Sequence, residues 1–248
     1  MGQARTRVLN EYRSKAEPER CTLSAKRDVR LSIIGAGGHA RVVADVARDS
    51  ALWTQIAFYD DTFLQESHSG GWPIIGDIAT LLSLTPASDH QLIIGSGDNQ
   101  RRHDLQLQLE QAGWRFATVI HPAASVSRGS TIEAGTLVMP GAIINHGSHI
   151  GKACIINSGA IVEHDCHLGV GVHISPGAVL SGRVDVGYMS WIGAASVILQ
   201  GTRIGSQSTI GAGAVVLRDI ADNSVAVGNP ARIIKQPPNA ALRLASQG

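Results

Sequence analysis

Residues 138–168 read VMPGAIINHGSHIGKACIINSGAIVEHDCHL, and in this stretch an aliphatic residue recurs at every sixth position. The same spacing continues without a break in both directions, from Val126 to Val216. The sixteen aliphatic positions are Val126, Ile132, Val138, Ile144, Ile150, Ile156, Val162, Leu168, Ile174, Leu180, Val186, Ile192, Ile198, Ile204, Ile210 and Val216. Four residues after each of them stands a mostly small residue, such as Ser148 or Ala160. A helical period of 3.6 does not fit this pattern, which instead indicates a repeat architecture.

An unbroken six-residue repeat is typical of a parallel β-helix, in which each hexapeptide forms one flat side of a coil. Three sides make a triangular coil, so we expect about five coils, with aliphatic residues inside and small residues at the corners. An aromatic content of only 4% beside 28 glycines agrees with such packing of small side chains. Glycine follows the aliphatic position directly at six places, where we expect turns with unusual backbone angles. These are Gly151, Gly169, Gly187, Gly193, Gly205 and Gly211.

A different pattern precedes the repeat, because short apolar runs alternate there with helix-like segments. Strands separated by helices predict a small Rossmann-like parallel sheet with right-handed crossovers. The region of about 90 residues is too short for two mononucleotide-binding halves, so one nucleotide fits it better than NAD. The expected strands are 29–34, 56–59, 73–75, 91–95 and 116–119, and the expected helices are 39–48 and 99–112.

The predicted organisation therefore has four parts. A mobile extension covers 1–28, a Rossmann-like domain 29–120, a β-helix 121–235 and a tail 236–248.

Charge and cysteine content narrow the class of protein. The net charge is +1 and no long apolar stretch is present, which argues against a nucleic-acid partner and against a membrane span. Cys21, Cys154 and Cys166 have no CxxC spacing, and no signal-peptide pattern precedes the first strand, so we expect a cytoplasmic protein. Cys154 and Cys166 occupy small-residue positions of the repeat and are expected in the core rather than as nucleophiles.

Five motifs together resemble one enzyme family. They are LSIIGAGGHARVVADVA at 31–47, FYDD at 58–61, GSGDNQRR at 95–102, VEHDCHLG at 162–169 and SVAVGNPARIIK at 224–235. The combination resembles the hexapeptide-repeat acyltransferases of the sialic acid O-acetyltransferase and bacillosamine or perosamine N-acetyltransferase family. That resemblance implies a left-handed β-helix, a homotrimer with acetyl-CoA between adjacent β-helices, and an N-terminal domain that holds a nucleotide-linked amino sugar. It implies transfer of an acetyl group to an amine or, alternatively, to a hydroxyl of sialic acid or another sugar, without a metal.

Histidines cluster in the repeat, and the length of a coil decides which of them are neighbours. His146 and His164 are 18 residues apart, so we expect them to stack at about 4.8 Å, and His149 and His167 form a second such column. Protonation of both of two stacked imidazoles is unfavourable because like charges repel, so one ring is expected to stay neutral near pH 7, as a general base requires.

The resemblance places the general base in the EHDC segment, at His164. Asp165, or with less support Glu163, would hold the other ring nitrogen and stabilise the imidazolium. Gly182 follows His164 by one coil, and its missing side chain is expected to leave room for a thioester.

A second group of residues is expected at the acyl donor. His173 lies half a coil from His164, so one subunit cannot bring the two together, whereas a trimer can. The resemblance suggests that His173 touches the donor; packing beside Trp191 is the structural alternative. The cofactor-binding residues that the resemblance implies are His173, Gly182, Ala194, Ala212, Gly228, Asn229 and Pro230.

The acceptor is expected at the carboxyl edge of the N-terminal sheet. GAGGHA at 35–40 follows a strand and opens a helix, so its N–H groups suit a phosphate. Acidic residues end the next strand, where they can bind ribose or a base edge, and a second loop leaves the same edge. Arg102 would pair with a phosphate or lie solvated on an exposed helix. The expected acceptor residues are Gly37, Gly38, His39, Asp60, Asp61, Asn99 and Arg102.

Two other functions remain open at this point. A zinc-dependent carbonic-anhydrase type of β-helix would use His146, His149, His164 and His167, although their spacing departs from that family's. A non-enzymatic scaffold would bind a sugar nucleotide without releasing CoA. A metal assay tests the first alternative and a thiol assay the second.

Overall fold

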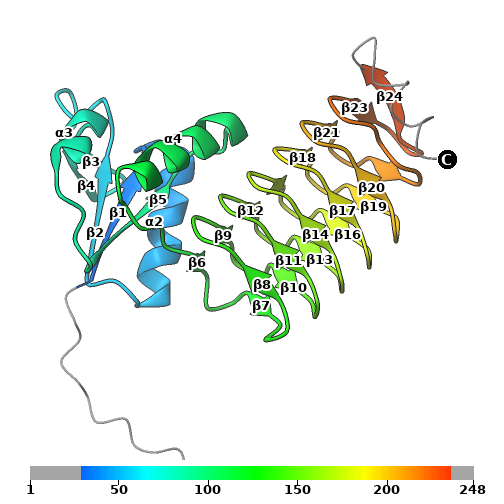
Figure 1. Ribbon diagram of the computed structural model, residues 1–248, viewed down its shortest axis with the longest axis horizontal. Helices are drawn as coiled ribbons and strands as arrows, with labels where there is room; N and C mark the ends of the chain where they lie inside the picture. The colour runs from blue at the N-terminus through cyan, green and yellow to red at the C-terminus, as the bar shows by residue number, and fades with distance from the viewer. Residues whose placement is uncertain (1–28, 236–248) are drawn as a thin grey trace, which may run out of the picture.

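The computed structural model describes residues 29–235, which form a small α/β domain followed by a long parallel β-helix (Figure 1). The chain passes from one to the other at β6 (Val119–Ile120), which pairs with the first full coil. The predictions for 1–28 and 236–248 lie outside the described residues. Within residues 29–235, no helix combines the length and the apolar character needed to cross a membrane.

The N-terminal sheet has the strand order β3-β4-β2-β1-β5, with β1 between two parallel neighbours. The strands are β1 (Arg30–Ile34), β2 (Gln55–Tyr59), β3 (His68–Ser69), β4 (Trp72–Gly76) and β5 (His90–Ile94). The sheet is mixed rather than wholly parallel, because β3 and β4 form an antiparallel hairpin. Gly70 and Gly71, with φ of 58° and 84°, supply the two-residue turn that such a hairpin needs. Of the strand expected at 116–119, only a single bridge between Phe116 and Leu92 joins this sheet, while Val119 begins β6 and pairs with the β-helix.

Three helices accompany this sheet: α2 (Gly38–Ser50), α3 (Ile78–Ser83) and α4 (Asn99–Gln111). Helix α2 packs between one face of the sheet and the start of the β-helix, in a core that includes Ile33 and Leu137. A Cβ on Gly95 would lie 2.6 Å from the Cβ of Ala40, so glycine at the end of β5 allows α2 to approach closely. Helix α4 covers the other face through Leu109.

The β-helix has three flat sides, each a stack of two-residue strands 18 residues apart, except for the longer β23 and β24 at the C-terminal end. Side 1 contains β7 (Ser125–Val126), β10 (Ile143–Ile144), β13 (Ile161–Val162), β16 (Val179–Leu180), β19 (Val197–Ile198) and β22 (Val215–Val216). Side 2 contains β8 (Thr131–Ile132), β11 (His149–Ile150), β14 (His167–Leu168), β17 (Asp185–Val186) and β20 (Arg203–Ile204). Side 3 contains β6, β9 (Leu137–Val138), β12 (Ile155–Ile156), β15 (His173–Ile174), β18 (Trp191–Ile192), β21 (Thr209–Ile210), β23 (Val225–Val227) and β24 (Arg232–Lys235). Only β24 runs antiparallel among these strands, and it closes the C-terminal end.

The sixteen aliphatic positions fill the interior, as the repeat predicts. From Val138 to Val216 each is at most 3% exposed, while Val126 and Ile132 pack against the same core at its N-terminal end. Cys154 and Cys166 are buried and unbridged, which confirms that they are core residues. Burial raises the pKa of the Cys154 thiol to about 12, so no reactive thiolate forms there at neutral pH.

The backbone role expected of the glycines after the aliphatic positions is wrong. Gly187 does not have a positive φ; instead a Cβ there would lie 2.5 Å from the backbone nitrogen of Ser206 in the next coil. These glycines therefore allow coils to approach closely. The left-handed residues recur at another corner position, occupied by Gly147, Asp165 and Arg183 with φ of 76°, 58° and 59°.

Candidate active site

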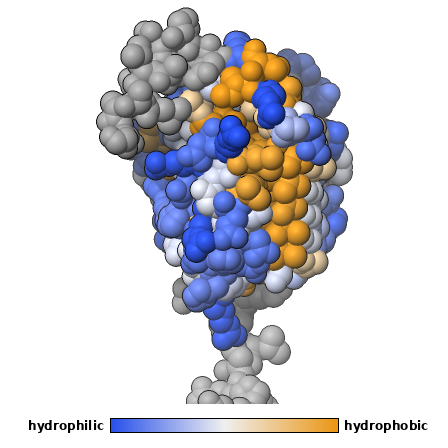
Figure 2. All heavy atoms as spheres, turned by 90° about the vertical axis from the view of Figure 1, so that its right-hand side faces the viewer, coloured by the Kyte–Doolittle hydropathy of each residue, from blue (hydrophilic) through white to orange (hydrophobic). Residues whose placement is uncertain are grey.

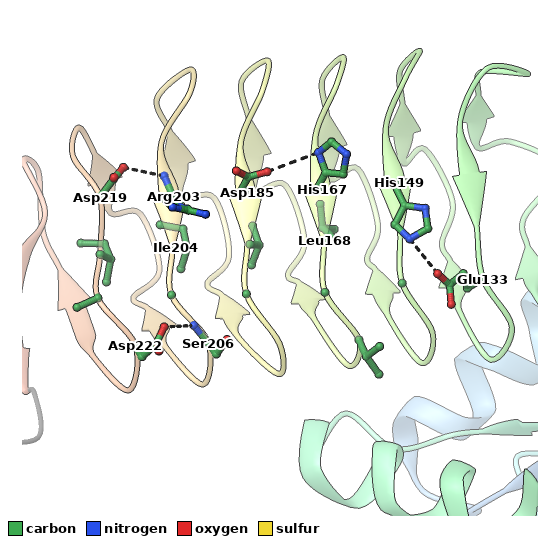
Figure 3. Close-up of a pocket in the computed structure, with 18 residues that line it drawn as sticks. Glu133, His149, His167, Leu168, Asp185, Arg203, Ile204, Ser206, Asp219 and Asp222 are labelled. Atoms are coloured by element: carbon green, nitrogen blue, oxygen red, sulfur yellow. Dashed lines mark hydrogen bonds and ion pairs between the residues drawn. The ribbon is translucent and has the colours of Figure 1, made fainter. Parts of the chain in front are cut away.

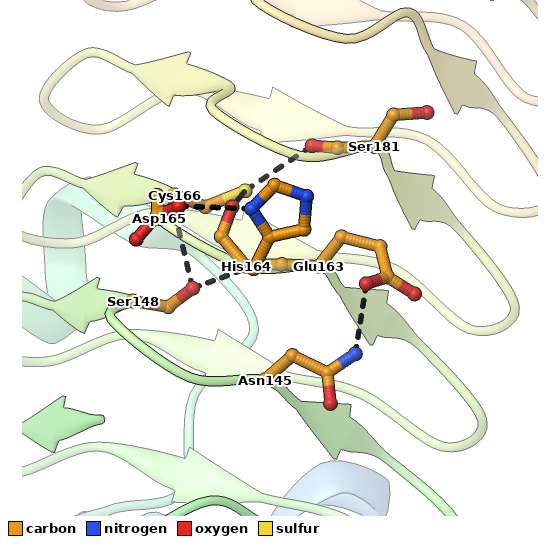
Figure 4. Close-up of polar contacts among 7 residues, drawn as sticks. All are labelled: Asn145, Ser148, Glu163, His164, Asp165, Cys166 and Ser181. Carbon is orange, nitrogen blue, oxygen red and sulfur yellow. Dashed lines mark hydrogen bonds and ion pairs between the residues drawn. The ribbon is translucent and has the colours of Figure 1, made fainter. Parts of the chain in front are cut away.

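His164 and Asp165 lie at the corner between sides 1 and 2, where β13 ends and β14 has not yet begun (Figure 4). The Nδ1 atom of His164 is 2.9 Å from Oδ2 of Asp165. This hydrogen bond holds the pKa of the Asp165 carboxyl below its usual range, so the group is an anion at neutral pH. Because a carboxylate only accepts, Nδ1 of His164 carries a proton, and in the neutral ring the lone pair therefore lies on Nε2. The pair therefore has the tautomer that a general base needs.

The imidazole of His164 lies over Gly182 in the next coil. A Cβ on Gly182 would lie 2.6 Å from Cε1 of His164, so the ring itself fills the space that we expected to receive a thioester. The ring of His146 leans the other way, over Gly129, where a Cβ would lie 3.1 Å from its Cγ. The expected stacking of the His146 and His164 rings is thus wrong, although their backbones are neighbours.

Two polar residues that were not among the predicted site residues hold this corner in place. The buried Ser148 donates its hydroxyl to the carbonyl of Glu163 at 2.7 Å and accepts the N–H of Cys166 at 3.1 Å. Asn145 Nδ2 donates to Oε2 of Glu163 at 2.9 Å, so Glu163 is paired with Asn145 and not with His164. Ser148 and Asn145 lie 18 residues before Cys166 and Glu163, so the spacing that paired the histidines also identifies these residues.

His173 lies on side 3, away from the corner of His164, as predicted for one subunit. Its ring stacks on Trp191 at a centroid distance of 5.7 Å and an interplanar angle of 7°, and its Nε2 is 3.2 Å from Nδ2 of Asn157. Burial, and then the charge of Arg102, lower the pKa of His173 to about 3. Its Nδ1 is buried beside the backbone of Gly97, without a hydrogen bond of normal geometry. The structural alternative, packing beside Trp191, is therefore observed, and contact with an acyl donor stays a prediction.

The loop before α2 is built as the sequence suggests. Gly37 caps the helix without a side-chain hydrogen bond, and no acidic residue stands in the first turn, so the first amides remain available to an anion. His39 in this turn has a buried Nε2 without a partner, and burial followed by the charge of Arg102 lowers its pKa to about 4. Gly38 is exposed beside it.

The two acidic residues after β2 differ in what they contact. Asp60 Oδ2 accepts the N–H of Ala36 at 2.8 Å, and Oδ1 accepts the N–H and hydroxyl of Thr62. Burial raises the pKa of Asp60, but these hydrogen bonds outweigh it and the net pKa lies below its usual value. Asp60 therefore fixes the loop at residues 35–38 through the N–H of Ala36, whereas Asp61 is exposed. Ribose binding stays a prediction, with Asp61 now the better candidate.

Arg102 is not placed as expected, whereas acceptor binding by Asn99 stays a prediction. Arg102 is fully buried rather than exposed, and its guanidinium donates to the carbonyls of Ala153 and Gly171 in the β-helix at 2.7 and 2.9 Å. Asn99 Nδ2 donates to the carbonyl of Met189 at 3.1 Å. Both side chains join α4 to the β-helix, so the predicted pairing of Arg102 with a phosphate or with solvent is wrong.

The remaining positions implied for the cofactor lie at another edge of side 1. Ala194 and Ala212, one coil apart, occupy the corner between sides 3 and 1. Gly228, Asn229 and Pro230 are exposed after β23, with a cis bond between the last two. In one protomer the width of side 1 separates these residues from His164.

The second histidine column lines a groove of about 750 Å³ along side 2 (Figure 3). His149 Nε2 is 2.8 Å from Glu133, His167 Nδ1 is 3.5 Å from Asp185, and the two rings are 6.5 Å apart. Each histidine is therefore paired with a carboxylate. Within residues 29–235, no group of three or more His, Cys, Asp or Glu side chains is placed to hold a metal ion.

Two known protein families match parts of this chain. Residues 30–109 match the PglD N-terminal domain family, and residues 184–218 match the hexapeptide repeat of succinyl-transferase. A search of curated proteins finds no match.

Several solved structures share the whole architecture. The acetyltransferase domain of PglB from Neisseria gonorrhoeae in complex with acetyl coenzyme A is 38% identical, covers 84% of this chain and 100% of its own, and has a TM-score of 0.80. PerB from Caulobacter crescentus, in complex with CoA and GDP-perosamine, is 37% identical over 83% of this chain and 97% of its own, with a TM-score of 0.77. WeeI from Acinetobacter baumannii is 28% identical over 83% and 100%, with a TM-score of 0.76. The resemblance drawn from the motifs is confirmed, and the chain belongs to the family of PglD-like hexapeptide-repeat acetyltransferases.

Proposed function

We propose that this protein transfers an acetyl group from acetyl-CoA to the amine of a nucleotide-linked sugar, with His164 as general base. The observation that carries the proposal is the 2.9 Å contact between His164 and Asp165 on an exposed corner, in a chain similar to structures solved with acetyl coenzyme A or with CoA and GDP-perosamine. A relative from Caulobacter crescentus is a perosamine N-acetyltransferase, which favours N-acetylation over O-acetylation.

The chemistry follows from the tautomer of His164. Nε2 takes a proton from the acceptor nitrogen as that nitrogen attacks the thioester carbonyl, and Asp165 stabilises the imidazolium. The tetrahedral intermediate then collapses with cleavage of the C–S bond, which releases CoA as the thiolate. Because the acceptor nitrogen attacks the thioester directly, the reaction needs neither buried cysteine as a nucleophile.

We propose further that the active form is a homotrimer. The outward residues of side 1 form a register-matched aliphatic column, and Figure 2 shows apolar residues gathered in one band at the C-terminal end of the β-helix. The column is Ile143, Ile161, Val179, Val197 and Val215, with exposed Leu199 and Leu217 beside it. An apolar band of this length is typical of an interface. If a copy packs there in threefold symmetry, the corner of His164 faces the neighbour's corner with Ala194 and Ala212.

His164→Ala tests the catalytic proposal. We expect kcat, followed by CoA release with a thiol indicator, to fall by about 10²–10⁴-fold while fold and ligand affinities persist. His146→Ala is the matched control, because His146 is exposed on the same corner one coil earlier and leans away. Near wild-type turnover by a correctly assembled His164→Ala protein would show that the base lies elsewhere.

Light scattering tests the trimer. Val197→Glu places a charge in the aliphatic column and should give inactive monomers, whereas Arg203→Glu on side 2 should leave the assembly unchanged. A wild-type protein that is active as a monomer would overturn this part of the proposal.

A further inference from the structure

The first turn of α4 contacts three successive corners of the β-helix. Arg102 donates through Nε to Ala153 O and through Nη2 to Gly171 O, and Asn99 donates to Met189 O. These three carbonyls are one coil apart and belong to residues with left-handed φ of 55°, 73° and 56°. The second and third corners lead directly into β15 and β18, which carry His173 and Trp191.

The same guanidinium also holds the second loop of the N-terminal domain. Nη1 of Arg102 donates to the carbonyl of Ser96 at 3.1 Å, and Nη2 donates to Oδ1 of Asn99 at 2.9 Å. That loop leaves β5 beside the end of β1 at Ile34, which Gly35 follows, since β1 and β5 are paired. Burial lowers the pKa of Arg102 only to about 10, so the side chain remains charged at neutral pH. The buried guanidinium of Arg102 thus joins the loop after β5 in the N-terminal domain to two corners of the β-helix.

The positive charge of Arg102 lowers the pKa of two histidines, one in each of the two domains that meet at this junction. His39 belongs to the first turn of α2 and His173 to β15, and the charge of Arg102 adds to burial in lowering the pKa of each. Each ring also has one buried nitrogen without a hydrogen bond of normal geometry. His39 lies in the loop region proposed for the acceptor, and His173 on the side proposed for the acyl donor.

We infer that Arg102 is a positioning residue. It fixes the loop at residues 96–99, on the sheet edge where the acceptor is expected, against the β-helix corner at Gly171 that precedes His173, so that acceptor and acyl group meet in one geometry. This inference rests on the proposed function. Because Arg102 is buried and bonded to protein on both sides, its loss should change how the two sites are aligned more than how tightly either one binds. Misalignment of reacting groups by about 1 Å lowers turnover by up to about 100-fold.

Steady-state kinetics with both substrates test the inference in the full-length assembled protein. Arg102→Met should lower kcat by about 10- to 100-fold while both KM values stay within about threefold. The matched control is Lys152→Gln, which removes an exposed ion pair with Glu110 at 3.1 Å across the same junction. An exposed ion pair of this kind contributes little to stability, so the kinetics of Lys152→Gln should equal those of the wild type. Unchanged kcat in Arg102→Met, or a loss confined to one KM, would overturn the inference.

Imidazole NMR titration gives a readout that does not need activity. Arg102→Met should raise the pKa values of His39 and His173, whereas Lys152→Gln should leave both unchanged. Arg102→Lys keeps the charge but cannot make the same set of hydrogen bonds, so both titrations should stay low while kcat falls. If Arg102→Met does not assemble, Arg102→Lys takes its place in the kinetic test. A kcat of Arg102→Lys equal to that of the wild type would then overturn the inference. A wild-type protein without transferase activity would refute the proposed function alone; unshifted histidines in Arg102→Met, or raised ones in Arg102→Lys, would refute the role of Arg102.

Discussion

His164 and Asp165 are adjacent in the chain, and their side chains meet at 2.9 Å because Asp165 adopts a left-handed φ of 58°. Aspartate and asparagine tolerate this conformation better than most residues with a side chain. The proposed catalytic pair is thus formed at a corner whose left-handed conformation recurs along the β-helix.

Replacing the carboxylate tests what it contributes to the base. Asp165→Asn keeps a residue suited to left-handed φ but removes the negative charge that stabilises the imidazolium. We expect kcat to fall, though by less than in His164→Ala, with unchanged thermal stability. Asp165→Gly is the control for backbone conformation, and it should resemble Asp165→Asn in rate. Wild-type turnover in both variants would show that Asp165 has no role in the reaction.

The position of the His164 ring depends on Gly182. Gly182→Ala would place a Cβ 2.6 Å from Cε1 of His164, so the ring must rotate away and kcat should fall by about tenfold or more. The double variant His164→Ala/Gly182→Ala removes the clash and should recover the unfolding temperature that Gly182→Ala loses. Additive losses in this double-mutant cycle, measured by thermal unfolding, would show that the two residues do not interact.

Acceptor affinity should depend on Asp61. Because Asp61 is exposed and its one hydrogen bond, from the N–H of Ile78, is long at 3.5 Å, Asp61→Ala should raise the acceptor KM and leave acetyl-CoA binding nearly unchanged by calorimetry. Asp60→Ala is an informative comparison, since it frees the N–H of Ala36 and should also lower the unfolding temperature. Equal loss of both affinities in Asp61→Ala would contradict the domain assignment.

Stability should fall in mild acid because two histidines are held neutral. The pKa values of His39 and His173 drop from 6.5 to about 4 and about 3 on folding, so the unfolded chain binds more protons below pH 6.5. Each group then costs up to about 1.4 kcal/mol of unfolding free energy per pH unit, beginning near 6.5 and ending near its folded pKa. Urea unfolding between pH 7.5 and 4.5 measures this slope. His39→Asn and His173→Asn should each flatten it, and an unchanged slope in both would contradict the assignment.

The sequence predicts the β-helix well because interior positions such as Ile156 and Ile174 have only one environment, set by the repeat. The direction of an outward ring is not set that way. His146 and His164 occupy equivalent corner positions, yet one leans on Gly129 and the other on Gly182, since each ring turns toward the nearest missing side chain.

The role of Arg102 escaped prediction for a related reason. The face of α4 that meets the β-helix packs on corners that present carbonyl oxygens, so its buried residues include the polar Arg102 and Gln106. A helix with such a polar buried face has no apolar stripe, and the sequence pattern therefore indicates an exposed helix. Only the partner surface shows that the charge is buried.

The 18-residue coil also restricts how this chain can change in length during evolution. Deleting a single residue between Val126 and Val216 would shift the frame of every later hexapeptide and turn outward side chains such as Arg203 into the prism. Removing one whole coil beyond the His164 corner keeps every remaining column in frame and only shortens the stack. Insertions and deletions in this part of the gene should therefore persist mainly as multiples of a full coil, or as loops extruded at a corner.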